Sequence, residues 1–314
     1  MNAESVRVAY FGTSDRSIPV LDSLNQNFEL VLCITKADTV VGRNREKRET
    51  EVKKWAKSNN KALVEIANIK EDKERIINAL KEAMVEIGVV ADFSFILPEE
   101  IINTPKYKLI NIHFSLLPKL RGASPVQFAI LQGFEKTGIT YYVVTKGMDN
   151  GPVLHQVDYN LHGTETAEVL WKTLFALAAE NLTSVIRNYI SGKTAPAEQN
   201  ETQATYTYSP SHPKNTFIYK EDAEIDWKNG YENIWRGIRA YTPWPIAWTT
   251  LEKLESSGWL NEMSLKIKPD KNKNLKVKVY EADLSNDKKL VIKTIQVEGS
   301  KKISWDEFKN GYLY

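Results

Sequence analysis

Short apolar runs alternate with amphipathic segments through the first half of the chain. The continuous runs, which predict buried strands, cover residues 6–11, 30–35, 87–91 and 109–113. The segments with apolar residues on one helical face, which predict helices, cover residues 17–25, 50–59 and 72–83. This alternation is typical of a parallel sheet covered by helices on both faces, so an α/β domain is expected.

The alternating pattern continues beyond residue 113 with a helix that begins at Pro125 and ends near residue 132. Two strands are then expected over residues 138–144 and 153–159, separated by a tight turn. Apolar residues next recur with helical spacing from about residue 166 to residue 190, which predicts one long amphipathic helix.

A polar segment divides the chain into two parts of different texture. Residues 192–209 are nearly free of aliphatic side chains, which is typical of a linker. Beyond them short alternating strands are expected, such as residues 276–280 and 290–297. We therefore expect a first domain over residues 1–191 and a smaller, β-rich C-terminal domain over residues 210–314.

Charge, cysteine content and hydropathy each exclude a class of protein. The chain has 42 Lys and Arg residues against 40 Asp and Glu, and this balance excludes a strongly basic nucleic-acid coat and a disordered acidic tail. Cys33 is the only cysteine, so neither an intrachain disulfide nor a cysteine-based metal site is expected. The N-terminus lacks the pattern of a signal peptide, and the longest apolar stretch, residues 87–97, is interrupted by Asp92. These features predict a cytoplasmic protein with no membrane partner.

An asparagine and a histidine stand where the chemistry of an α/β domain is usually found. Asn111 and His113 are two residues apart at the end of a predicted strand, so their side chains point to the same face. Ligands of open parallel sheets bind beyond the carboxyl ends of the strands, so the amide and the imidazole are expected to face one crevice. Asp149, in the turn after a later strand, is the candidate carboxylate that orients the imidazole.

An amide, an imidazole and a carboxylate favour direct acyl transfer, with a stabilised oxyanion and movement of protons. Covalent hydrolase chemistry is not expected, because neither Ser14 nor Ser115 lies in a Gly-x-Ser-x-Gly element. An Asn-x-His pair alone is equally typical of a strand end with a structural histidine, so the surrounding sequence has to decide.

The surrounding sequence resembles the folate-dependent formyltransferases. The resemblance is carried by NIHFSLLPKLRGASPVQFAILQG and TGITYYVVTKGMDNGPVL, and it begins at VAYFGTSDRSIPVL. It resumes at EIDW, IRAYTPWPIAW and ISWDEFKNGY, so it covers most of the chain in order. It implies a Rossmann-like parallel-sheet domain followed by an OB-like domain. It also matches the catalytic asparagine, histidine and aspartate of the family to Asn111, His113 and Asp149.

The resemblance further implies the substrates and their contacts. N10-formyltetrahydrofolate would be the formyl donor and the α-amino group of initiator methionyl-tRNA the acceptor, in a monomer that needs no metal. The C-terminal domain would contact the tRNA. The implied folate contacts lie in the loop of residues 91–98, at Phe95, Ile96 and Leu97, and after the histidine, at Ser115, Leu116, Leu117 and Pro118.

Two basic segments are candidates for contact with a nucleic acid. Residues 38–48 predict a polar loop with four basic side chains within its last six positions. The resemblance implies that this loop, with Arg43 and Arg45, reaches the acceptor end of the tRNA, whereas composition alone equally indicates a solvated surface loop. Six lysines between residues 266 and 278 fit either an edge strand protected by charge or a surface that follows phosphates.

Three functions remain open on this evidence. The leading one is formyl transfer to initiator methionyl-tRNA, and the second is the same chemistry on a nucleotide-linked amino sugar. The third is a folate- or RNA-binding module without turnover, against which the intact Asn111, His113 and Asp149 argue. The basic loop favours the tRNA, because a sugar nucleotide does not require it.

Overall fold

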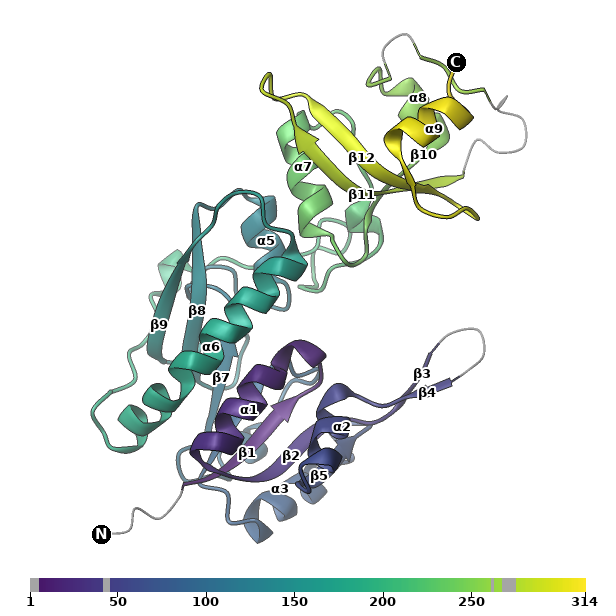
Figure 1. Cartoon of the computed structure of the whole chain (residues 1–314). Helices are drawn as coiled ribbons and strands as arrows, with labels where there is room; N and C mark the ends of the chain where they lie inside the picture. Colours follow the sequence, from purple (N-terminus) through teal and green to yellow (C-terminus); the bar gives the residue numbers. More distant parts are fainter. Residues whose placement is uncertain (1–5, 42–45, 261–262, 267–274) are drawn as a thin grey trace. The chain divides into compact units, whose positions relative to one another are not determined.

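The computed structural model describes residues 6–41, 46–260, 263–266 and 275–314 (Figure 1). The chain divides into two compact units. The first unit comprises Met1–Arg121, Thr137–Asn160 and Trp171–Thr205, and the second comprises Gly122–Lys136, Leu161–Leu170 and Tyr206–Tyr314. Most of the segment expected to be a linker, residues 192–205, thus belongs to the first unit.

The first unit is built on a seven-stranded sheet with the order β5-β2-β1-β6-β7-β8-β9. Its strands are β1 (Arg7–Gly12), β2 (Glu29–Lys36), β5 (Ala62–Ile66), β6 (Ile87–Ala91), β7 (Leu109–His113), β8 (Lys136–Val143) and β9 (Val153–Asn160). The five strands from β5 to β7 are parallel, whereas β8 runs antiparallel to β7. The predicted parallel sheet of an α/β domain is therefore confirmed. The direction of β8, antiparallel to its neighbour, was not predicted.

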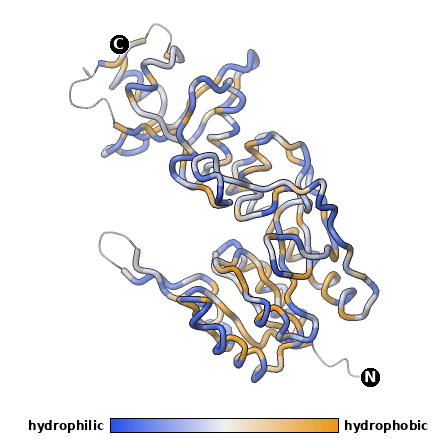
Figure 2. Tube along the Cα trace, turned by 180° about the vertical axis from the view of Figure 1, so that it is seen from behind, coloured by the Kyte–Doolittle hydropathy of each residue, from blue (hydrophilic) through white to orange (hydrophobic). Residues whose placement is uncertain are grey.

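Helices cover both faces of this sheet, so all five residues of its central strand, β6, are buried. One face carries α1 (Ile18–Asn27), α2 (Glu51–Ser58) and the long helix α6 (Ala167–Ile190), where Ser23 of α1 hydrogen-bonds Ala179 of α6 (Figure 1). The other face carries α3 (Lys73–Glu82) and α4 (Glu99–Ile102), which pack on β1, β2 and β5. Hydrophobic residues accordingly gather along the strands and the helix turns that face them (Figure 2).

Helix α6 agrees closely with the long amphipathic helix expected over residues 166–190. Within the described residues it is the one helix that could cross a membrane by length and composition. Its side chains are divided between two environments, because Leu174, Phe175, Leu182 and Ile186 are fully buried whereas Val169 is 52% exposed. This division is typical of an amphipathic helix that packs on a protein core.

A short antiparallel pair replaces part of the polar loop expected over residues 38–48. Strands β3 (Thr39–Val41) and β4 (Glu46–Arg48) pair with each other, and they follow the carboxyl end of β2. The loop prediction was wrong at these ends, where three β-branched residues, Thr39, Val40 and Val41, favour a strand.

The second unit has a four-stranded antiparallel sheet with the order β10-β11-β12-β13. The strands are β10 (Ala247–Thr250), β11 (Lys276–Leu284), β12 (Leu290–Val297) and β13 (Ile303–Ser304). Its helices include α5 (Pro125–Leu131), α7 (Tyr231–Ala240), α8 (Leu251–Ser256) and α9 (Trp305–Tyr312). Ile238, Val279, Ile295 and Phe308 lie in its core. The expected β-rich character of this part of the chain is confirmed.

Candidate active site

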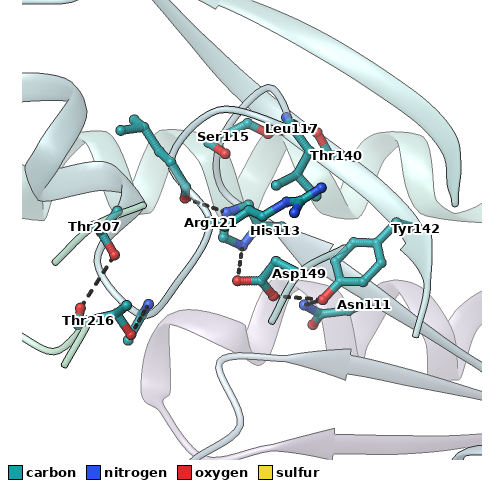
Figure 3. A network of polar contacts seen from close by, with 12 residues as sticks. Asn111, His113, Ser115, Leu117, Arg121, Thr140, Tyr142, Asp149, Thr207 and Thr216 are labelled. Carbon is teal, nitrogen blue, oxygen red and sulfur yellow. Dashed lines mark hydrogen bonds and ion pairs between the residues drawn. The ribbon is translucent and has the colours of Figure 1, made fainter. Parts of the chain in front are cut away.

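The structure brings Asn111, His113 and Asp149 together at the carboxyl end of β7. Asn111 and His113 lie on the last residues of that strand, where β8 pairs with it so that Asn111 faces Tyr142 and His113 faces Thr140. Asp149 returns to the same place in the turn that follows β8. Figure 3 shows the side chains of Asn111, His113, Tyr142 and Asp149 turned toward one another. The juxtaposition expected from the sequence is therefore present.

The imidazole of His113 is held so that one defined nitrogen faces the carboxylate. Its Nε2 lies 2.9 Å from the carbonyl oxygen of Leu120, and because a carbonyl can only accept, Nε2 must carry a hydrogen. Its Nδ1 lies 3.7 Å from Oδ2 of Asp149. His113 is only 5% exposed. The nitrogen left to exchange a proton at this site is therefore Nδ1.

The turn that carries Asp149 is closely fitted to the strand before it. Asp149 itself has a left-handed backbone, with φ of 50°, which asparagine and aspartate tolerate better than most side chains. A Cβ on Gly151 would lie 1.9 Å from the carbonyl oxygen of Val143, so only glycine fits there without a backbone shift. The side chain of Gln199 donates to the carbonyl oxygens of Asp149 and Gly151, at 2.8 Å each.

A buried arginine in turn holds this glutamine. Arg121 is 1% exposed, and its guanidinium donates to Oε1 of Gln199 at 2.8 Å. The same guanidinium makes two hydrogen bonds to the carboxylate of Glu201, at 2.7 and 2.8 Å, and thereby lowers the pKa of Glu201. The sequence gives no signal for Gln199, because this residue lies in a polar segment, 78 residues from Arg121, that is typical of a linker.

Tyr142 connects the amide and the carboxylate and was also missed. Its hydroxyl donates to Oδ1 of Asp149 at 2.7 Å and accepts from Nδ2 of Asn111 at 2.9 Å. Burial, followed by the nearby charge of Asp149, raises the pKa of Tyr142 well above its ordinary value. The available signal was its position in β8, directly opposite Asn111.

The loop after His113 is fastened to β8 and β9 through its backbone. Thr140 donates its hydroxyl to the carbonyl oxygen of Ser115 at 2.7 Å and accepts from the amide of Leu117 at 3.0 Å. Gln156 donates to the carbonyl oxygen of Leu117 at 2.9 Å. Four folate contacts were expected in this loop. The side chains of Ser115 and Leu117 are buried, so only Leu116 and Pro118 present partly exposed side chains.

The second expected folate loop follows β6, the parallel neighbour of β7. The carboxyl ends of both strands lie at one edge of the sheet, so this loop and the loop after His113 start from the same edge. Phe95 and Leu97 pack against the core, and Phe95 lies 5.5 Å from Phe93 between ring centroids. Ile96, by contrast, is 87% exposed.

Only some of the basic residues expected to contact a nucleic acid lie within the described part of the chain. Arg43 and Arg45 lie outside the described residues, whereas Lys47 and Arg48 on β4 are exposed. In the second unit Lys276 and Lys278 are exposed on β11. Since β11 pairs with β10 on one side and β12 on the other, the edge-strand interpretation was wrong for these two lysines. Lys268, Lys271 and Lys273 also lie outside the described residues.

One further observation bears on what the site can bind. Among the described residues no group of three or more His, Cys, Asp or Glu side chains is arranged to hold a metal ion.

Both parts of the sequence match models of one protein family. Residues 6–186 match the family described as formyl transferase, and residues 217–313 match the formyl transferase C-terminal domain. Methionyl-tRNA formyltransferase of Bacillus cereus (strain G9842) is 33% identical over 312 residues, which are 98% of this chain and 96% of the relative. The relative of the same name from Bacillus mycoides (strain KBAB4) is 33% identical over 311 residues, with the same two shares.

Solved structures share the fold at lower identity. Methionyl-tRNA formyltransferase from Clostridium thermocellum has a TM-score of 0.56 and 19% identity, over 93% of this chain and 98% of that one. WlaRD, a sugar 3N-formyl transferase crystallised in the presence of dTDP and 5-N-formyl-THF, has a TM-score of 0.58 and 17% identity, over 95% and 99%. At these identities the two structures support the fold alone.

Proposed function

The chain belongs to the formyl transferase family, and on this premise we propose that it transfers the formyl group of N10-formyltetrahydrofolate to the α-amino group of initiator methionyl-tRNA. The observation that carries the proposal is the meeting of Asn111, His113 and Asp149 at one edge of the sheet. The similarity to methionyl-tRNA formyltransferases across 98% of the chain supports the choice of acceptor. The reaction would take place in the cytoplasm, in a monomer, without a metal ion.

The three side chains have distinct roles in the proposed reaction. An α-amino group has a pKa of about 7.7–8, so a useful fraction is uncharged and nucleophilic near neutral pH. As its nitrogen attacks the formyl carbon, negative charge develops on the formyl oxygen. The amide of Asn111 donates one hydrogen to Tyr142, and no described residue accepts its second hydrogen, which would bind that oxygen. Nδ1 of His113, when protonated, would add a second donor.

Proton movement completes the exchange of bonds. The new carbon–nitrogen bond forms at the amino acid, and the bond from the formyl carbon to N10 of the folate breaks. The attacking amine loses one proton and the leaving nitrogen gains one. Asp149 lies 3.7 Å from Nδ1 of His113, where its charge would stabilise the imidazolium and help to accept the proton of the amine.

Exposed side chains of the two units, each taken by itself, support a flat organic donor and a polyanionic acceptor. Ile96 is exposed in the loop after β6, at the edge of the sheet where β7 also ends. An apolar side chain beside a polar site is typical of ligand contact. Exposed Lys47 and Arg48 extend the basic segment for which we propose acceptor-end contacts through Arg43 and Arg45. Lys276 and Lys278 provide a second exposed basic pair that phosphates could contact.

We expect the purified protein to formylate initiator methionyl-tRNA in preference to any amino sugar. The measurement is transfer of labelled formyl from N10-formyltetrahydrofolate to charged initiator tRNA, beside a panel of nucleotide-linked amino sugars. Uncharged tRNA is the control, because it lacks the acceptor amine. Transfer to a sugar nucleotide but not to methionyl-tRNA would replace our proposal with the second candidate.

Arg43→Ala is expected to weaken formylation of methionyl-tRNA and to leave folate binding unchanged. If Arg43 binds one phosphate, its loss should lower the slope of log affinity against log salt by about one unit. Lys81→Ala is the matched control, since Lys81 is exposed at the end of α3, which leads into β6 at the opposite edge of the sheet. Equal tRNA kinetics and equal salt slopes for the two variants would exclude Arg43 from the acceptor contact.

A further inference from the structure

We propose that Tyr142 is a positioning residue that fixes the amide of Asn111 and the carboxylate of Asp149 relative to each other. The inference rests on the proposed function, because it assumes that these two groups act on the substrate. It assigns to Tyr142 no contact with the substrate. Its evidence is the pair of hydrogen bonds made by one hydroxyl, at 2.7 Å to Asp149 and at 2.9 Å from Asn111.

The direction of the two hydrogen bonds determines how the Asn111 amide is turned. An ionised carboxylate can only accept, so the single hydrogen of the Tyr142 hydroxyl goes to Asp149. The hydroxyl oxygen must then accept from its other neighbour. Asn111 therefore presents its NH₂ group to Tyr142, and the amide cannot rotate by 180° without bringing its oxygen against the hydroxyl oxygen. One N–H of the Asn111 amide is therefore used by Tyr142, and the second N–H is left for the formyl oxygen of the substrate.

The fold explains why a tyrosine reaches both groups. Strand β8 runs antiparallel to β7 and places residue 142 directly opposite Asn111. The chain then leaves β8 and returns within seven residues, which brings Asp149 to the same hydroxyl. Tyr142 is 4% exposed, so water competes little for these bonds.

The charged groups around the hydroxyl leave it protonated. Asp149 faces it from the turn, and Arg121 lies close enough to oppose the effect of Asp149. Burial is the largest influence, and it raises the pKa of Tyr142 well above the ordinary value. The residue is therefore a hydrogen-bond donor to Asp149 throughout the neutral range and is not itself an acid or a base.

Tyr142→Phe removes the hydroxyl and keeps the ring. We expect kcat to fall about 10- to 100-fold, with the KM of donor and acceptor changed less than about threefold, because groups displaced from the transition state cost turnover more than binding. Tyr141→Phe is the matched control. Tyr141 is also buried, and its hydroxyl donates to the carbonyl oxygen of Ala178 on α6, so its loss tests a structural role alone.

A second comparison tests whether Tyr142 acts through Asn111. In the Asn111→Ala background the additional loss caused by Tyr142→Phe should be much smaller than in the wild type, because the amide that it orients is gone. A loss of the same size in both backgrounds would contradict action through Asn111.

The last measurement needs no activity. Hydrogen exchange of the Asn111 side-chain amide, followed by NMR and assigned by its absence in Asn111→Ala, should be faster in Tyr142→Phe than in Tyr141→Phe. Equal exchange rates, or equal kcat for the two phenylalanine variants, would overturn the inference. A wild-type protein that transfers no formyl group would refute the proposed function instead, and the exchange rates would still decide the positioning role.

Discussion

His113→Ala is expected to lower kcat of formyl transfer at least about 100-fold, the effect of removing one well-placed group that stabilises an oxyanion. The structure indicates which atom accounts for this loss of turnover. Nε2 of His113 is hydrogen-bonded to the carbonyl oxygen of Leu120, so the nitrogen that faces Asp149 is Nδ1. Alanine leaves no nitrogen to carry the proton. The measurement is kcat with the acceptor that the wild type formylates, together with circular dichroism to confirm folding.

His155→Ala is the matched control for this prediction. His155 lies on β9, is exposed, and stacks on Tyr141 at 6.3 Å between ring centroids. Its removal takes away an imidazole that has no place in the proposed reaction. Near-normal turnover of folded His113→Ala, at a rate like that of His155→Ala, would exclude His113 from the proton transfer. Asn111→Ala should resemble His113→Ala, since it removes the other donor to the oxyanion.

Asp149→Asn should also lose at least about 100-fold in kcat, while folate binding is retained. Asparagine has the size of aspartate and adopts the left-handed backbone that this turn requires. The two hydrogen bonds from Gln199 go to backbone oxygens of the turn, so the substitution does not remove them. What is lost is the negative charge beside Nδ1 of His113.

The pH dependence separates a charge effect from a shape effect at Asp149. If the carboxylate stabilises the imidazolium, the pH profile of kcat should change in Asp149→Asn, whereas binding of the folate measured by calorimetry should not. Asp149→Ala, which loses both the charge and the side-chain shape, should be no more active than Asp149→Asn. A rate and a pH profile equal to those of the parent would show that Asp149 serves only the turn.

The elements that sequence could predict are those whose patterns are long or fully apolar. The limits of β6 and β7 agree with the expectation, because β6 is a continuous apolar run and β7 buries Leu109, Ile110 and Ile112 beside its two polar residues. Strand β5 escaped notice, since it lies at the edge of the sheet and includes the polar Glu65. Helices α8 and α9 are too short to show a repeating stripe.

The same distinction holds for the candidate site. The pairing of Asn111 with His113 follows from the two-residue period of a single strand, so local sequence was sufficient. The parts played by Tyr142 and Gln199 depend on contacts between residues 31 and about 50 positions apart. Such contacts are set by how β7, β8 and the later segment meet in the fold, and no short pattern in the chain encodes them.

The attachment of Gln199 also determines where this protein can be divided. A fragment that ends at residue 191 keeps Asn111, His113 and Asp149 but has no side chain to hold the carbonyl oxygens of the aspartate turn. It also lacks Thr205, which hydrogen-bonds the backbone of the loop after His113 through its own backbone and hydroxyl. A chimera that exchanges C-terminal parts between relatives should therefore be joined beyond Thr205. Residues 192–205 and β7 then come from the same parent protein.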